Sequence, residues 1–290
     1  MTTRSFGAQG MAGRLRRVLV NRPGPRFGAG HETEGAFYPE PIDLPLAQHQ
    51  HDGLVALLED AGATVERLDH EAGADSIYTY DPAVVTNGGA IVLRSSKLIR
   101  QPEADAHADW FTRNGIPILH RLTGGATADG GDLLWLDSRT LVIGRTFRTN
   151  DEGARQIEAA VRPHVDAVHV IDLPITNGAE ECLHTLSLIS MVDRDLAVVS
   201  TRLMPVHLWR LLAERGVDCV EIEASEWDSL AHNVLALAPR ECVMLEGNPI
   251  TAGRLREAGC TVHEFAGSDV AVKGAGGPTC LTLPLLRDPI

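Results

Sequence analysis

Residues 57–65 read Leu57-Leu58-Glu59-Asp60-Ala61-Gly62-Ala63-Thr64-Val65, which is the end of an amphipathic helix, a break and the start of an apolar strand. Glycine just past a helix favours the left-handed conformation that ends it. The same succession recurs from Trp110 to Leu119, Ala160 to Val170, Leu211 to Ile222 and Leu255 to Phe265. With breaks at 62, 115, 164, 216 and 259, the separations are 53, 49, 52 and 43 residues. A unit repeated at this period indicates a repeat architecture, and we expect five units to close into a ring with a central site.

Strand signals precede the predicted helices. Residues 83–86 and 90–93 flank Asn87-Gly88-Gly89, whose residues tolerate the positive φ of a tight hairpin. Each unit therefore reads as strand pair, helix and return strand, which is an α/β pattern. No linker rich in proline, glycine or serine divides the chain, so we predict one domain over residues 14–290. The small and polar residues 1–13 could form a disordered N-terminus.

Composition restricts the class of partner. The 290-residue chain has 26 basic and 39 acidic residues and a net charge of −13, which argues against nucleic acid and anionic lipid as partners. The charge is compatible with a small cationic substrate. No apolar run approaches the roughly 20 residues that a membrane helix needs, and no secretory signal opens the chain. Five scattered cysteines without a CxxC pair predict reduced thiols in the cytoplasm, with no metal site. His49 and His51 are expected to be solvated.

Two segments carry side chains suited to nucleophilic and proton-transfer chemistry. Cys280 lies where the glycine-rich segment 274–278 enters an apolar strand, so its thiol could be exposed beside bare backbone. His184 lies between polar turn residues and an apolar run, and histidine is the natural proton carrier near neutral pH. The alternatives are a buried cysteine that only packs and a structural or solvated histidine.

Three acids lie in two further segments. Asp129 precedes two glycines and a strand, where an acid could equally satisfy turn backbone donors. Asp75 and Asp81 are six residues apart, a spacing that places both on one face of an extended segment. Two carboxylates at one cavity would suit a guanidinium. These acids, His184 and Cys280 are distributed over the first halves of different units.

In these motifs the chain resembles the guanidino-group-modifying superfamily, the penteins, and is closest to dimethylargininase (dimethylarginine dimethylaminohydrolase), with some features of arginine deiminase. The motifs are Asp75-Ser76 followed by Asp81, Asp129-Gly130-Gly131-Asp132, Arg148-Thr149-Asn150, Leu183-His184 and Thr279-Cys280-Leu281. The resemblance covers nearly the whole chain. It implies a five-bladed ββαβ propeller with pseudo-fivefold symmetry.

The resemblance also implies roles for single residues. Cys280 matches the nucleophile and His184 the general acid/base, while Asp81 and Asp129 match the acids that hold the guanidinium. Asp75 matches a residue that binds the α-amino end of the substrate. The pair that grips the α-carboxylate is matched by Arg100 and Arg148. No cofactor and no metal are implied, and a homo-oligomer is compatible with the family.

The chain departs from the dimethylargininase pattern at one position. Typical dimethylargininases have glutamate immediately before the acid matched by Asp81, whereas this chain has Tyr80. We expect Tyr80 and the aperiodic segment 23–45 to shape the substrate pocket, with segment 23–45 acting either as a lid or as a surface connection. Asp81-Pro82 is closer to the arginine deiminase pattern.

The expected function is hydrolysis of dimethylarginine to citrulline and dimethylamine by a cysteine-dependent enzyme. The alternatives are an arginine deiminase, which forms citrulline and ammonia, and an amidinotransferase. A protein of a different class, a binder of guanidino compounds without catalysis, would keep the fold and the cation site.

Overall fold

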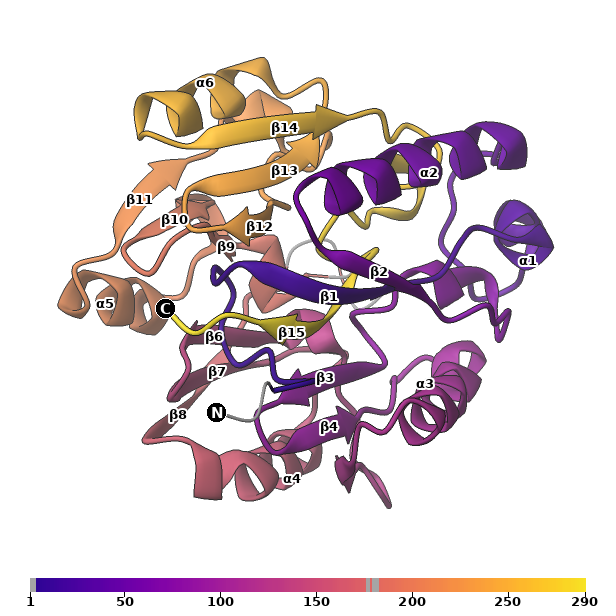
Figure 1. The fold of residues 1–290 in the computed structure, drawn as a ribbon, viewed down its shortest axis with the longest axis horizontal. Coiled ribbons are helices and arrows are strands. Elements are labelled where there is room, and N and C mark those ends of the chain that lie inside the picture. The colour runs from indigo at the N-terminus through magenta and orange to yellow at the C-terminus, as the bar shows by residue number, and fades with distance from the viewer. Residues whose placement is uncertain (1–3, 176–177, 179–182) are drawn as a thin grey trace.

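The computed structural model of the protein describes residues 4–175, 178 and 183–290. Its strands form five three-stranded sheets (Figure 1). In sequence order, the sheets consist of β3 (Ala83–Thr86), β4 (Gly89–Val92) and β5 (Ile118–Arg121); β6 (Leu133–Asp137), β7 (Thr140–Arg145) and β8 (Ala167–Asp172); β9 (Ile189–Met191), β10 (Leu196–Val199) and β11 (Asp218–Glu221); β12 (Leu235–Ala238), β13 (Glu241–Leu245) and β14 (Thr261–Phe265); and β15 (Leu283–Arg287), β1 (Leu15–Val20) and β2 (Thr64–Arg67).

All five sheets have the same connectivity. The first two strands are antiparallel, and the third is parallel to the middle strand. The helix between the middle and third strands is α2 (Leu44–Asp60), α3 (Gln101–Arg113), α4 (Asp151–Val161), α5 (Val206–Glu214) or α6 (Pro249–Glu257). A short helix, α1 (Pro25–Gly28), precedes α2. Because β15 pairs with β1, the two ends of the chain complete one sheet together.

The repeated unit that the sequence predicts is confirmed as a mixed α/β fold of five small sheets. The first strand of each sheet is mostly buried, and the third is largely accessible. Figure 1 shows α2 to α6 spread around the periphery of the molecule. The glycines at four breaks, Gly62, Gly115, Gly216 and Gly259, have φ values of 66° to 87°, as their position after a helix predicts.

The N-terminal segment packs against two sheets. Gly7 N donates to Leu285 O at 2.8 Å, and Ala8 N donates to Val85 O at 3.1 Å. Ala8 and Ala12 are buried. Residues 7–12 are thus part of the folded structure, although they belong to segment 1–13, which is predicted to be a possibly disordered N-terminus. Residues 1–3 lie outside the described residues.

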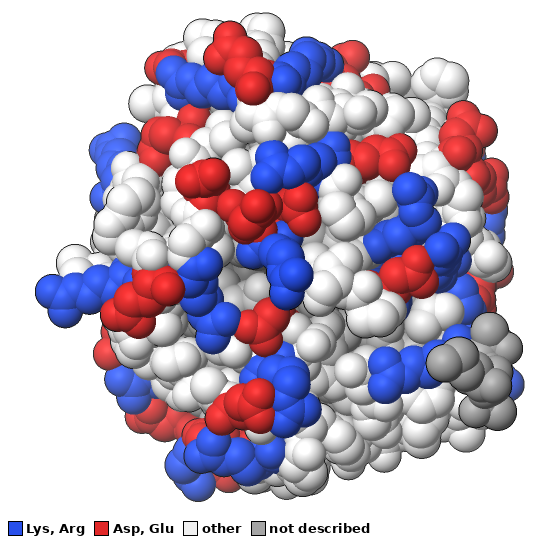
Figure 2. All heavy atoms as spheres, turned by 60° about the vertical axis from the view of Figure 1, so that its left-hand side comes forward, with Lys and Arg blue, Asp and Glu red and all other residues white. Residues whose placement is uncertain are grey.

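The surface charges are interspersed rather than separated by sign. Figure 2 shows basic and acidic side chains alternating over one face of the molecule. Many of them form exposed ion pairs between neighbouring segments, such as Arg240 with Asp193 and Asp195. None of the described helices combines the length and apolar character that a membrane crossing needs.

One sequence-based expectation about histidine is wrong. His49 is exposed in α2, but His51 is only 1% exposed. Neither ring nitrogen of His51 has a hydrogen-bond partner within the described part of the chain. Burial lowers the pKa of His51 to about 4, although the nearby Asp52 carboxylate acts in the opposite direction. The helical period places residue 51, and not residue 49, on the buried face that includes Leu54, Val55 and Leu58.

We expect His51→Leu to flatten the loss of stability on acidification. The folded state holds His51 neutral between its pKa of about 4 and the unfolded value of about 6.5, so the unfolded chain binds more protons there. The stability that His51 contributes is therefore present above pH 6.5 and is lost as the pH falls towards 4. Between pH 7 and pH 5, His51→Leu should remove about 2 kcal/mol of the decrease in the free energy of unfolding. Urea titrations at both pH values measure this difference, and His49→Leu is the matched exposed control. An unchanged pH dependence in His51→Leu would contradict the assignment.

Candidate active site

The candidate catalytic residues precede the buried first strands of four sheets. Asp81 lies two residues before β3, and Asp129 four residues before β6. His184 lies five residues before β9, and Cys280 three residues before β15. The equivalent position in four repeated units brings residues together that are far apart in the sequence.

Two acids and the histidine converge in a buried cluster. One ligand atom each from Asp81, Asp129 and His184 lies within 4.8 Å of the others. Gly131 lies between them: its N–H donates to Asp81 Oδ1 at 3.3 Å, and a Cβ at this position would lie 2.8 Å from the His184 ring. Glycine is required at residue 131 because a larger side chain would occupy the place of the imidazole.

Asp132 orients the imidazole of His184. Its carboxylate is fully buried and lies 3.0 Å from His184 Nδ1. It also accepts hydrogen bonds from the hydroxyls of Thr146, at 2.8 Å, and Thr149, at 2.6 Å. With Nδ1 held by a carboxylate, the imidazole has a defined orientation, as a group that transfers protons requires.

The two acids of the cluster are held in different electrostatic states. Both oxygens of Asp129 are buried and lack a hydrogen-bond partner within the described residues. Burial, reinforced by the charge of Asp81, raises the pKa of Asp129 to about 6. Burial also opposes ionisation of Asp81, but the charges of Arg100 and His184 hold the pKa of Asp81 below its usual value. An unpaired buried carboxylate is costly unless a cation or a donor joins it, so the cluster is suited to a cationic ligand.

The segment that carries Cys280 is fixed from two sides. Tyr80 N donates to Cys280 O at 3.3 Å, which places the cysteine next to the turn that carries Asp81. On the other side, Asn233 Nδ2 lies 3.3 Å from the sulfur and Asn233 Oδ1 accepts from Thr279 N at 3.0 Å. The Cys280 side chain is partly accessible rather than enclosed in the core, as a reacting thiol requires.

Three carboxylates surround the guanidinium of Arg100, the residue that was predicted to help grip a substrate carboxylate. Its Nη1 donates to Asp81 Oδ2 at 2.8 Å, and its Nε and Nη2 form a two-pronged pair with Glu103 at 2.9–3.2 Å. Asp75 Oδ2 lies 3.7 Å from Arg100 Nε. Arg100 is 7% exposed. A buried guanidinium in this arrangement is a counter-ion for Asp81, and its predicted contact with a substrate carboxylate stays a prediction.

Asp75 lies at the edge of the same network. Its carboxylate accepts from the Tyr38 hydroxyl at 2.8 Å and lies 3.4 Å from Lys97 Nζ. Tyr38 belongs to the aperiodic segment 23–45, and Lys97 Nζ lies 4.6 Å from the ring centroid of Phe37 in the same segment. The segment thus reaches the site instead of merely connecting β1 to α2, and Asp75 is one of its anchors.

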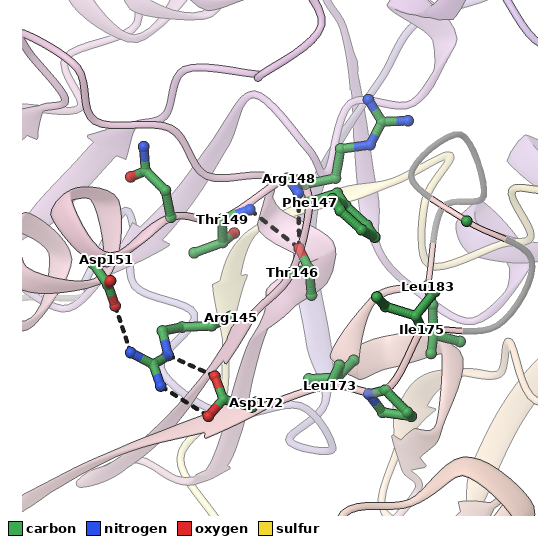
Figure 3. Close-up of a pocket in the computed structure, with 13 residues that line it drawn as sticks. Arg145, Thr146, Phe147, Arg148, Thr149, Asp151, Asp172, Leu173, Ile175 and Leu183 are labelled. Atoms are coloured by element: carbon green, nitrogen blue, oxygen red, sulfur yellow. Dashed lines mark hydrogen bonds and ion pairs between the residues drawn. The ribbon is translucent and has the colours of Figure 1, made fainter.

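Arg148 approaches the acid cluster from β7 and its following turn. Its Nε lies 4.0 Å from Asp129 Oδ2, and its side chain is 9% exposed. Figure 3 shows the Arg148 side chain directed away from Arg145, which is held by Asp151 and Asp172. Both arginines line a cavity of about 350 Å³ with an apolar wall that includes Phe147 and Ile175. Arg148 is thus the arginine near the site that can still meet an anionic group of a ligand.

Tyr80 does not face the acid cluster, and its expected place in the substrate pocket is corrected. The Tyr80 hydroxyl donates to Met11 Sδ at 3.6 Å, and the ring is buried in the core. Burial raises the pKa of Tyr80 above the range in which it could exchange a proton near neutrality. Residues 79–82 form turns, with Asp81 N donating to Tyr78 O at 3.3 Å, and in this turn the Tyr80 side chain packs into the core while Asp81 joins the acid cluster. Only the backbone of Tyr80 contributes, through its bond to Cys280.

Sequence reasoning overlooked two residues of the site, Asp132 and Asn233. Asp132 ends the Asp129-Gly130-Gly131-Asp132 motif, but no role was predicted for it. The sequence does not tell which of two acids three residues apart contacts the histidine and which contacts the ligand. Asn233 lies two residues before β12, the position that supplies a reactive side chain in the other four units. The period of the repeat could have pointed to it.

A metal ion is geometrically possible in the acid cluster. Asp81, Asp129 and His184 offer nitrogen and oxygen ligands at a spacing that fits one ion. The same three residues, two of them acids, also fit an organic cation. The sequence predicted no metal, and this stays a prediction.

The comparison with protein families identifies the class of the chain. The arginine deiminase family matches residues 74–216 and 210–287, which is most of the sequence. The chain belongs to the arginine deiminase family. Its predicted membership of the guanidino-group-modifying superfamily is confirmed, and so is the prediction that it is an enzyme.

Related sequences agree with this class at low identity. YkgA of Bacillus subtilis, an uncharacterized protein, is 26% identical over 258 residues, which are 89% of this chain and 86% of YkgA. The arginine deiminase of Listeria welshimeri is 24% identical over 254 residues, 73% of this chain and 61% of that enzyme. The arginine deiminase of Rhodococcus opacus is 29% identical over 196 residues, 57% and 47% of the two chains. The chain thus spans less than two thirds of the length of these arginine deiminases.

Solved structures share the fold. A variant of dimethylarginine dimethylaminohydrolase from Pseudomonas aeruginosa, complexed with citrulline, has a TM-score of 0.77 at 21% identity and covers 93% of this chain and 99% of its own. The N-terminal domain of ArgZ, a cyanobacterial arginine dihydrolase bound to product, has a TM-score of 0.80 at 18% identity, with 93% and 97% covered. SxtG, an amidinotransferase from Microseira wollei, has a TM-score of 0.77 at 16% identity, with 98% of each chain covered.

Proposed function

We propose that the protein is a cysteine-dependent hydrolase that converts the guanidinium of arginine or an N-methylated arginine to the ureido group of citrulline. The observation that carries the proposal is the buried cluster of Asp81, Asp129 and His184, in which neither oxygen of the Asp129 carboxylate accepts a hydrogen bond from the residues that the structure describes. A planar cation with several N–H donors matches two carboxylates on one cavity. Cys280, tied to the backbone of Tyr80 next to Asp81, supplies the nucleophile.

The proposed reaction has two halves. In the first, the Cys280 thiolate attacks the guanidinium carbon, a C–S bond forms, and the C–N bond to the leaving amine breaks as His184 gives that amine a proton. Asp81 and Asp129 hold the remaining nitrogens through the tetrahedral stage. In the second half, His184 takes a proton from water and the hydroxide attacks the thiouronium carbon. The C–S bond then breaks to release the thiolate, and the new oxygen loses its remaining proton to solvent as the ureido C=O forms. Dimethylarginine releases dimethylamine, and arginine releases ammonia.

We also propose that the five sheets are the blades of a pseudo-fivefold propeller within one domain, residues 14–290. The shared connectivity, the buried first strands and the peripheral helices support this arrangement. It explains why one side chain from the start of each first strand reaches a common centre. A cytoplasmic location and a homo-oligomer stay predictions.

A substrate panel tests the proposal. Arginine, monomethylarginine, dimethylarginine and agmatine are incubated separately with the protein, and ureido product is measured. We expect citrulline from at least one substrate that carries an α-carboxylate. Added glycine, lysine or ornithine distinguishes an amidinotransferase, which would yield a new guanidino compound. Saturable binding of all four without any product would overturn the hydrolase and favour the non-catalytic binder.

The Arg148→Ala protein should lose its preference for amino-acid substrates. A two-pronged arginine–carboxylate contact is a hydrogen bond between charged groups, and its loss corresponds to roughly 10- to 100-fold in kcat/KM. We expect this decrease for the carboxylate-bearing substrate and almost none for agmatine, which lacks the group. Arg145→Ala is the matched control, because Arg145 lines the same cavity but is paired with Asp151 and Asp172. Equal turnover of agmatine and the amino acid by the unmodified protein would show that Arg148 is no carboxylate clamp.

A further inference from the structure

The fifth sheet also presents a polar side chain at the position that supplies the reactive groups of the other four. Asn233 lies two residues before β12, as Asp81 lies two residues before β3. The Asn233 side chain is buried, with 4% of the residue exposed. All five units therefore contribute a polar side chain near the start of their first strand.

The amide of Asn233 has a determined orientation. Thr279 N is a donor, so the atom that receives it at 3.0 Å must be the amide oxygen. The amide nitrogen then faces Cys280 Sγ, 3.3 Å away, and its N–H donates to the sulfur. A second bond, from Thr279 Oγ1 to Val234 O at 3.3 Å, attaches the same two segments to each other. The position of the donor relative to the sulfur is therefore fixed by three contacts.

Glycine at residue 277 makes room for this amide. A Cβ on Gly277 would lie 2.7–2.8 Å from the Cγ, Cβ and Oδ1 atoms of Asn233, closer than real Cβ contacts allow. The glycine-rich approach to Cys280 is thus shaped, at this residue, by the asparagine that meets the sulfur. From the sequence, these glycines were predicted only to leave the Cys280 thiol exposed.

We propose that Asn233 is a catalytic residue that donates a hydrogen bond to the Cys280 sulfur, stabilises the thiolate and aims it at the guanidinium carbon. This inference rests on the proposed function, since it assigns a role at the same nucleophile. A hydrogen bond to the charged form of a group favours that form, and bonds to ionised partners are the stronger ones. The neutral amide gains a better acceptor when the thiol ionises, and it keeps donating when the thiolate leaves in the second half of the reaction.

The test is the pH dependence of Cys280 alkylation by iodoacetamide, read by mass spectrometry of the peptide that contains it. In Asn233→Ala, the apparent pKa of the thiol should rise by about one to two units, the shift that the loss of one hydrogen bond to a charged group produces. The value of kcat should fall roughly 10- to 100-fold with KM changed less than about threefold. Asn233→Asp keeps the oxygen that receives Thr279 N and removes the donor, so it should show the same direction even if the alanine protein folds poorly.

Asn248→Ala is the matched control. Asn248 is a fully buried asparagine of the same unit, and its Nδ2 donates to Ser229 O and Leu245 O instead of the thiol. This variant should lower Tm and leave the alkylation profile unchanged. Folded Asn233 variants with the alkylation profile and kcat of the unmodified protein would overturn the role of Asn233 while turnover itself stands. An unmodified protein with no turnover and an unreactive Cys280 would instead overturn the proposed function.

Discussion

The Cys280→Ser protein is expected to lose citrulline formation and to form no covalent adduct with substrate. The thiolate is a strong nucleophile near neutral pH, whereas a serine hydroxyl at the same place needs a base to remove its proton during attack. Removing the nucleophile of a comparable covalent enzyme lowers kcat by about 10⁶-fold, and we expect a decrease of at least about 10⁴-fold here. Quenched turnover followed by intact-protein mass spectrometry detects the thiouronium adduct directly.

Cys219→Ser is the matched control for this substitution. Cys219 lies in the outer strand β11, and burial raises the pKa of its thiol. Its loss should leave both turnover and adduct formation unchanged. Full activity of Cys280→Ser would remove covalent catalysis from the proposal, and an adduct that persists in that protein would place the nucleophile on another residue.

The repeat was predictable because the residues at the end of each helix mark the boundaries of its unit. Helix ends at Gly62, Gly115, Gly216 and Gly259 are local events, and a glycine with positive φ can be anticipated from the residues beside it. The same local reasoning placed Asp81, Asp129, His184 and Cys280 at matching points of four units. Asp81, Asp129 and His184 meet in one cluster, as the closure of the units into a ring, which the period of the repeat suggested, would predict.

Side-chain partners were not predictable in the same way. Arg100 was predicted to bind a substrate carboxylate, whereas in the folded chain its guanidinium is paired with Glu103, in the first turn of α3, and with Asp81, at the start of the same unit. A buried guanidinium pairs with whichever carboxylates the fold brings within reach, and a linear sequence does not rank them. The prediction for Tyr80 failed for a simpler reason, because residues 79–82 form turns and the backbone of a turn decides that the Tyr80 side chain enters the core.

Environment explains why identical residue types at the site play different parts. Asp129 and Asp132 are three residues apart and both fully buried, yet Asp132 is surrounded by the donors of Thr146, Thr149 and His184. Asp129 has no such donors among the described residues, and its pKa is raised to about 6. One acid is therefore committed to the histidine and the other is left for the ligand, a division that only the three-dimensional contacts reveal.

The His184→Ala protein is expected to lose turnover almost as completely as Cys280→Ser, but to stop at a different point. In the proposed reaction, His184 acts as acid in the first half and as base in the second. Each such proton transfer accelerates the reaction by about 10²–10⁴-fold. A substrate whose leaving group needs no proton, such as S-methylthiocitrulline, should bypass the first requirement. In His184→Ala the Cys280 thiolate should displace methanethiolate from this compound, and the thiouronium adduct should accumulate because no base activates water.

The accumulation separates a chemical role from a structural one. Asp132→Asn keeps the size of the side chain but replaces the carboxylate that lies 3.0 Å from His184 Nδ1, so it should reproduce the His184→Ala behaviour with a smaller decrease in kcat, roughly 10²-fold. His169→Ala, in the outer strand β8, is the control and should turn over normally. One result would contradict this order of steps, namely that S-methylthiocitrulline leaves no adduct on His184→Ala while the unmodified protein turns it over. The histidine would then be needed for the attack itself. His184 would generate the thiolate by removing the proton of Cys280, and the hydrogen bond from Asn233 would not be sufficient to do so.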